Sequence, residues 1–161
     1  MVTNMKLKKT NEDRRQSLIE PEELIEIIVD DVVYYCKPVP SFDGYFATTC
    51  GSIISTMQKL PRVLKFSRKD KKSEYLRVHL SGTSKQVHRV IASAFLAASV
   101  SNCRNEEPRI EVNHIDGDPR NNKVANLEIV SPAENRAWAN VLKAAEAERH
   151  LAKASVGCTT L

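Results

Sequence analysis

Residues 110–140 read IEVNHIDGDPRNNKVANLEIVSPAENRAWAN, and this stretch decides the fold of the second half of the chain. Ile110–Ile115 has the short, strand-like mixture of β-branched and polar residues. It ends at Asp116–Pro119, whose sequence Asp-Gly-Asp-Pro is a strong turn signal. Ala125–Val130 then resumes as a second strand-like run. We therefore expect two strands joined by a polar loop.

A helix start follows directly after the second strand. Ser131 is a good capping residue, and Pro132 suits the first helical position. Glu134 lies three residues after Ser131 and completes a capping box. The segment beyond is rich in alanine and contains no helix breaker before Gly157. The expected order is strand, polar loop, strand, helix.

The polar residues on this frame suggest a catalytic site. Asn113 and His114 end the first strand, where alternation would separate their side chains unless the strand bends. Asn135 lies in the first turn of the helix, which packing would bring towards Asn113. Two amide oxygens with phosphate and water would suit magnesium, and a helix N-terminus favours phosphate. His114 would activate water as the general base, and Asn126 would brace the loop.

The residues upstream predict a small β-rich unit. Ser41–Leu96 alternates short β segments with turn residues, and we interpret it as an antiparallel sheet closed by a helix. We expect helices over Glu22–Val29 and Val90–Ala98, and the first 21 residues as a loosely held basic arm. Strands are expected over Val32–Cys36, Tyr45–Thr49, Ser52–Met57, Val63–Phe66, Tyr75–Leu80 and Gln86–His88.

Positive charge is unevenly distributed along a chain of 161 residues with net charge +4. The segment Lys59–Lys72 holds seven cations and one acid. Such clusters suit polyanions through counterion release, although a solvated surface would look the same. We expect His88 to be structural or to contact phosphate. The residues that we expect to contact such a polyanion are Lys59, Arg62, Lys65, Arg68, Lys69, Lys71, Lys72, Arg77 and Arg89.

The four cysteines are far apart: Cys36, Cys50, Cys103 and Cys158. A structural zinc site needs closely spaced pairs, so we expect none. The opening residues are basic and polar rather than apolar, and no apolar run approaches a membrane span. We therefore expect a cytoplasmic protein with reduced thiols and no membrane segment.

Together these residues resemble a known family. Val112–Asp118, then Asn121-Asn122, Asn126-Leu127-Glu128 and Glu134-Asn135, is similar to the motif of the HNH endonucleases, in particular the free-standing homing nucleases of bacteriophages. Residues 43–53 resemble the small β module that often precedes this motif, and residues 87–92 resemble the linker into it. The resemblance covers about residues 41–140.

The resemblance implies an α+β protein. A small antiparallel β module would precede a ββα-metal (HNH, His-Me finger) nuclease motif and a C-terminal helix. It implies His114 as general base, Asn113 and Asn135 as metal ligands, and Asn126 as the middle asparagine of the motif. The cofactor would be Mg²⁺ or Mn²⁺, and the reaction would hydrolyse a phosphodiester bond of double-stranded DNA.

The sequence departs from the family pattern at two positions. Asn113 stands where relatives often have aspartate, and a neutral ligand binds a hard cation more weakly. Trp138 stands where relatives often have histidine, and we expect it to pack in the core. The expected organisation is an arm with a short helix and strand at 1–40, a DNA-binding β module at 41–98 and the nuclease motif at 105–153.

Two other functions are compatible with the sequence. The chain could bind DNA without cutting it, with residues 105–153 as a degenerate HNH framework. It could instead be an interaction protein whose basic segment meets RNA or an acidic partner. One active site per chain naturally cuts one strand, so both a monomer and a homodimer are compatible with the sequence. If a phage or mobile element encodes the protein, we expect it in the cytoplasm of the host cell.

Overall fold

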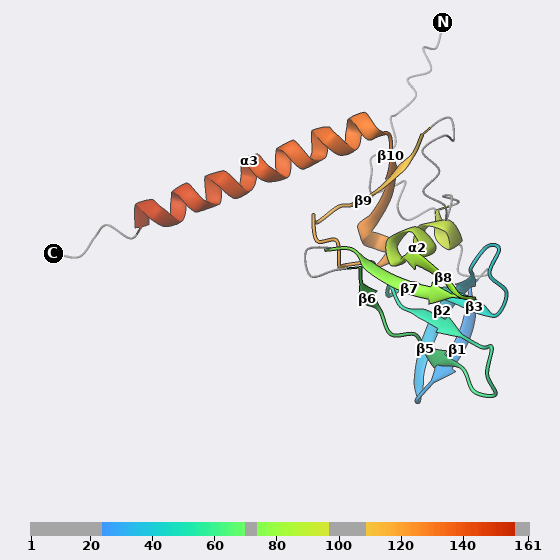
Figure 1. Ribbon diagram of the computed structural model, residues 1–161. Helices are drawn as coiled ribbons and strands as arrows, with labels where there is room; N and C mark the ends of the chain where they lie inside the picture. Colours follow the sequence, from blue (N-terminus) through green and yellow to red (C-terminus); the bar gives the residue numbers. More distant parts are fainter. Residues whose placement is uncertain (1–23, 70–73, 97–108, 157–161) are drawn as a thin grey trace, which may run out of the picture.

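The computed structural model describes residues 24–69, 74–96 and 109–156. Within them the strands are all antiparallel and form three separate sheets. Two α-helices, α2 (Val87–Phe95) and α3 (Pro132–Val156), accompany these sheets in the described part (Figure 1). This mixture of antiparallel sheets and helices confirms the α+β class predicted from the sequence.

The first sheet is a five-stranded meander, in which each strand pairs with the next along the chain. The pairing of β2 with β3 joins the segment before residue 40 to the sheet that follows it. Its strands are β1 (Ile25–Val29), β2 (Val32–Pro38), β3 (Tyr45–Thr48), β4 (Ile53–Ser55) and β5 (Arg62–Val63).

The helix expected over Glu22–Val29 is wrong, because the described part of this segment is strand β1. Asp30 and Asp31 both have positive φ, 49° and 63°, and form a two-residue turn between β1 and β2. Such turns match the twist of a β-hairpin, and aspartate tolerates the left-handed conformation. The β-branched residues of β1 then suit the strand better than a helix.

The second sheet orders β6 (Ser67–Arg68), β7 (Leu76–Leu80) and β8 (Thr83–Gln86). The predicted alternation in β7 is confirmed, since Val78 and Leu80 are buried whereas His79 is exposed. Helix α2 begins at Val87, so the return strand ends at Gln86 and does not continue to His88.

Helix α2 lies at the centre of the molecule and contacts strands of all three sheets. Its residues Val87, Val90, Ile91, Ala92 and Phe95 are buried in the main hydrophobic core. Val112, Val124 and Leu127 belong to the same core. The shared core fixes the second half of the chain against the β-rich first half.

The predicted strand–loop–strand–helix order is confirmed. Strand β9 (Glu111–His114) pairs with β10 (Leu127–Val130), which the 3₁₀ turn η2 (Val124–Asn126) precedes. Helix α3 begins at the expected residue. The capping box is present: the Ser131 backbone N–H donates to Glu134 Oε2 at 2.8 Å, and the Glu134 N–H donates to Ser131 Oγ at 3.3 Å.

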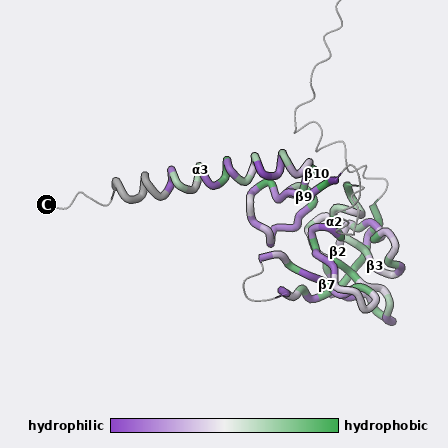
Figure 2. The backbone as a smooth tube through the Cα atoms, turned by 45° about the horizontal axis from the view of Figure 1, so that its top comes forward, coloured by the Kyte–Doolittle hydropathy of each residue, from purple (hydrophilic) through white to green (hydrophobic). Residues whose placement is uncertain are grey.

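Helix α3 starts against β9 and β10 and then extends away from the rest of the molecule (Figure 1), and hydrophilic residues are mixed with hydrophobic ones along the part of the helix that Figure 2 colours. The side chain of Leu142 in α3 packs close to Gly117 of the polar loop, where an added Cβ would lie 2.8 Å from Leu142 Cδ1. Among the described residues, no helix has the length and apolar character that crossing a membrane requires.

Candidate active site

The three residues proposed for chemistry line one pocket. Asn113 and His114 come from the end of β9, and Asn135 comes from the first turn of α3. The pocket has a volume of about 270 Å³, which suits a phosphate group with water. His114 O accepts a hydrogen bond from Gly117 N at 3.0 Å, so the chain turns immediately after the strand. This turn allows neighbouring residues to reach the same pocket.

Asn122 holds the ring of His114. The His114 Nε2 atom lies 3.2 Å from Asn122 Oδ1, and both side chains are buried. Asn122 Nδ2 donates to the carbonyl oxygen of Arg120 at 3.0 Å, so the amide oxygen faces the imidazole. Nε2 therefore carries the proton, and Nδ1 keeps the lone pair that a general base needs.

The electrostatic surroundings favour neutral His114. Burial lowers the pKa of His114 below the usual histidine value, although the hydrogen bond to Asn122 and the charges of Asp116 and Asp118 act in the opposite direction. A lowered pKa keeps the ring unprotonated at neutral pH. The basic form of His114 is therefore the ground state.

Asn126 organises the loop that carries these residues. Its Oδ1 accepts from Asp116 N at 3.1 Å, and its Nδ2 donates to Asp116 Oδ1 at 2.9 Å and to Asn121 O at 2.8 Å. Asp116 also accepts a hydrogen bond from Asn121 Nδ2 at 2.6 Å. These bonds join the two ends of the loop. Asn126 thus has the geometry of a bracing residue, and the direct partner of His114 is Asn122.

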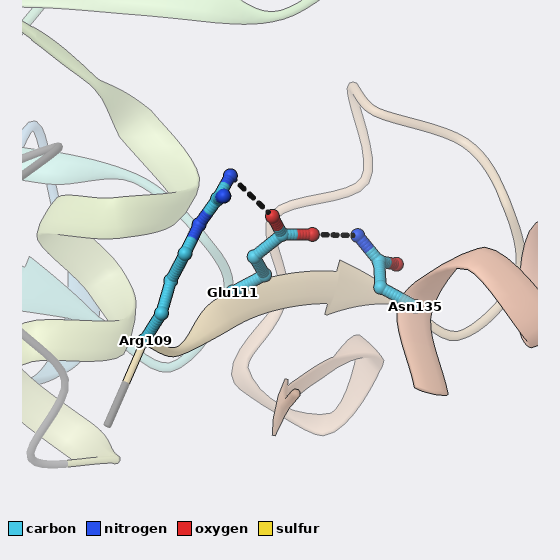
Figure 3. A network of polar contacts seen from close by, with 3 residues as sticks. All are labelled: Arg109, Glu111 and Asn135. Atoms are coloured by element: carbon cyan, nitrogen blue, oxygen red, sulfur yellow. Dashed lines mark hydrogen bonds and ion pairs between the residues drawn. The ribbon is translucent and has the colours of Figure 1, made fainter. Parts of the chain in front are cut away.

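Both candidate metal ligands pair with carboxylates. Asn113 Nδ2 donates to Glu128 Oε1 at 2.9 Å, across the β9–β10 ladder. Asn135 Nδ2 donates to Glu111 Oε2 at 2.7 Å, and Glu111 Oε1 accepts from Arg109 at 3.1 Å (Figure 3). Each amide nitrogen therefore donates to a carboxylate, so the amide oxygens are the acceptors that these two side chains can offer to a ligand.

Two further aromatic side chains pack around His114. The ring centroid of His88 lies 5.1 Å from those of both His114 and Tyr75. His88 Nδ1 is buried and has no hydrogen-bond partner in the described structure. Burial, with the nearby charges of His114 and Arg89, lowers the pKa of His88 to about 3. His88 is thus a neutral packing neighbour of His114, whereas Tyr75 lines the pocket.

The turn between β3 and β4 supports the loop from below. Thr49 O accepts a hydrogen bond from Val124 N at 3.1 Å. Gly51 has a φ of +89°, and a Cβ there would lie 2.6 Å from the backbone carbon of Asn122. Only glycine permits this close approach. The β-rich half of the chain therefore fixes the segment that holds His114.

The cations of the basic segment lie mainly on the surface. Arg77 is half-buried and donates to Ser84 Oγ at 2.8 Å and to Ser84 O at 2.9 Å, and Arg89 is also half-buried. Lys71 and Lys72 lie outside the described residues. The other candidate DNA-contacting cations in the described structure are exposed: Lys59, Arg62, Lys65, Arg68 and Lys69.

Three residues at the site were not expected from the sequence. Asn122, which contacts the ring of His114, reads as an ordinary turn residue, and its sequence signal is only the adjacent pair Asn121-Asn122. Arg136 and Trp138 line the pocket itself. Trp138 was expected in the core, but it is 37% exposed because the first part of α3 covers the open pocket and not the core.

Comparisons with known proteins match the motif segment. Residues 100–137 match a protein family described as HNH endonuclease. No curated protein matches the chain. The chain is similar to a solved structure entitled "DNA binding and cleavage by the HNH homing endonuclease I-HmuI", with 24% identity and a TM-score of 0.48. The similarity covers 73% of this chain and 66%, just under two thirds, of that one.

The family match falls on the residues that carry the predicted resemblance. It includes β9, the polar loop, β10 and the start of α3. The resemblance of this segment to the HNH endonucleases is therefore confirmed.

Proposed function

We propose that the protein is an HNH endonuclease that hydrolyses a phosphodiester bond of double-stranded DNA with one divalent metal ion, Mg²⁺ or Mn²⁺. The observation that carries the proposal is the pocket shared by Asn113, His114 and Asn135. The orientation of His114 by Asn122 supports the role of His114 as general base. The HNH family match of residues 100–137 supports the same activity.

The donor set fits a hard cation. Among the described residues, no group of three or more histidine, cysteine or acidic side chains is arranged to hold a metal ion. The pocket instead offers the amide oxygens of Asn113 and Asn135, which suit magnesium when water and phosphate complete the coordination. Bound there, the ion would stabilise negative charge on the phosphate and the leaving oxygen.

The chain's own residues supply the proton transfer. His114 Nδ1 accepts a proton from the attacking water, whose oxygen forms the new bond to phosphorus as the bond to the leaving oxygen breaks. Asn122 Oδ1 stabilises the resulting imidazolium through Nε2–H. Arg136 lines the pocket with positive charge, which favours phosphate. Asn126 acts as a positioning residue, through the loop.

The exposed basic segment supplies the proposed DNA contact. In the β6–β7 pairing, Arg68 lies opposite Leu76, one residue from Tyr75 in the pocket. A DNA backbone that follows Lys59–Lys69 would therefore arrive at the pocket. We propose residues 41–98 as the DNA-contacting module and 105–153 as the nuclease module, encoded by a phage or mobile element and acting in the cytoplasm as monomer or homodimer.

Incubation of the protein with supercoiled plasmid tests the proposal. We expect relaxed or linear DNA with Mg²⁺ or Mn²⁺, none with EDTA, and a large loss for His114→Ala. Binding without cleavage under all conditions would instead support a non-catalytic DNA-binding protein. A preference for RNA over duplex DNA in the same binding assay would contradict the proposed substrate.

A further inference from the structure

We propose that Glu128 is a positioning residue for the neutral ligand Asn113. Its carboxylate accepts a hydrogen bond from the Asn113 amide and supplies the negative charge that an aspartate ligand would carry itself. Glu111 would act on Asn135 in the same way. The inference rests on the proposed function, because it concerns the proposed metal site. It explains how two neutral amides can serve a divalent cation.

The Asn113–Glu128 pair is built into the strand ladder. The two residues are direct cross-strand partners in β9 and β10, so their side chains lie on the same face. Asn113 is only 8% exposed, and its Nδ2 donates to Glu128 Oε1 at 2.9 Å. A hydrogen bond to a charged acceptor is stronger than a neutral one and fixes which way the amide points. Asn113 Oδ1 is thereby left to accept other partners.

Polarisation follows from this bond. An amide that donates to a carboxylate gains negative charge on its oxygen, because linked hydrogen bonds polarise one another in surroundings of low dielectric constant. The carboxylate also places its negative charge one hydrogen bond away from the amide that would hold the cation. Partners of this kind orient metal ligands and raise their basicity in many metal sites.

The Asn135–Glu111 pair repeats the arrangement between β9 and α3 at 2.7 Å (Figure 3). Glu111 shares its charge with Arg109, whose guanidinium lies 3.1 Å away. In the part of the chain that the structure describes, Glu128 has no such cation. Glu128 should therefore contribute more to cation affinity than Glu111.

The pairing also predicts what an aspartate would do at position 113. Asn113→Asp alone removes the donor and sets two carboxylates about as close as the present 2.9 Å contact. Like charges at that separation repel, and we expect this repulsion to outweigh the gain of a charged ligand. Combining Asn113→Asp with Glu128→Gln restores one donor and one acceptor and moves the charge into the ligand itself.

Mn²⁺ titration of the full-length protein without DNA tests the inference. Trp138 is the chain's single tryptophan and lines the pocket, so paramagnetic Mn²⁺ bound there should quench its fluorescence. We expect Glu128→Gln to raise the Kd for Mn²⁺ about tenfold or more, and Glu111→Gln by less. Asn113→Asp should also weaken binding, and the double variant should return it near the wild-type value.

Glu74→Gln is the matched control, because Glu74 lines the same pocket and is exposed, and the structure gives it no bond to either amide. A Kd increase for Glu74→Gln equal to that for Glu128→Gln would overturn the inference, since general charge would then explain both. Tighter binding by Asn113→Asp alone would also overturn it, because Glu128 would then be a direct ligand. Absence of saturable quenching in the wild-type protein would remove the proposed metal site itself.

Discussion

Replacing Gly51 with alanine should reduce cleavage, although this residue lies far from the pocket in sequence. Gly51 has a φ of +89°, and its missing Cβ would lie 2.6 Å from the Asn122 backbone carbon and 2.7 Å from its oxygen. Ordinary contacts begin at 3.4 Å, so the Asn122 segment must move by about 0.8 Å. A misplacement of about 1 Å can cost roughly 100-fold in rate. We expect a loss of ten- to 100-fold.

Gly82→Ala is the matched control for this experiment. Gly82 also has a positive φ, 78°, but its Cβ would meet nothing within 4 Å. Both substitutions place alanine in the left-handed region, at a cost of about 1–2 kcal/mol. The difference between the two variants therefore reports the contact with Asn122.

The assay is the single-turnover nicking rate of both variants, measured beside their free energies of unfolding from urea denaturation. We expect Gly82→Ala to lose stability and keep the wild-type nicking rate. Gly51→Ala should lose more stability and most of its activity. Equal nicking rates in the two variants would show that the β3–β4 turn does not position Asn122 for catalysis.

Three further predictions concern neighbouring features. The pKa of His88 is about 3 in the folded chain against 6.5 normally, so the unfolded chain binds a proton first as the pH falls. The free energy of unfolding should therefore be unaffected by His88 above pH 6.5 and be lower by roughly 3 kcal/mol at pH 4. Denaturation of His88→Phe should show a shallower pH dependence than wild type. Asn126→Ala should slow nicking about tenfold while leaving DNA affinity unchanged in a gel-shift assay, and weakened DNA binding would contradict a purely local role. The double variant Arg68→Gln with Lys69→Gln should make the plot of log K for DNA binding against log salt concentration less steep, by about 2. An unchanged slope would exclude these two cations from the DNA interface.

Local chemistry explains what the sequence could predict. The Ser131–Glu134 capping box involves groups only three residues apart, and it forms at the predicted place. The alternation in β7 likewise needs only its own burial. The meeting of Asn113, His114 and Asn135 in one pocket could be predicted because the two strands, the turn between them and the helix start each have a local sequence signal.

Interactions between distant segments explain what the sequence could not predict. In the sequence Asn122 looks like a turn residue. In the structure its backbone packs against Gly51, some 70 positions earlier, and the residue is only 4% exposed. The strand at Ile25–Val29 depends on an Asp-Asp turn, which lacks the usual asparagine-glycine signal. Trp138 resembles a core residue by composition, and only the direction of α3 shows that it borders the pocket.

The most direct test of the central claim is chemical rescue of His114→Ala. Removal of the ring should reduce magnesium-dependent nicking at least 100-fold, a typical contribution of a general base. Imidazole added to the buffer should restore part of that rate, whereas it should leave the His88→Ala variant unchanged. Wild-type nicking by His114→Ala would contradict the account, because the water would then lose its proton to another group.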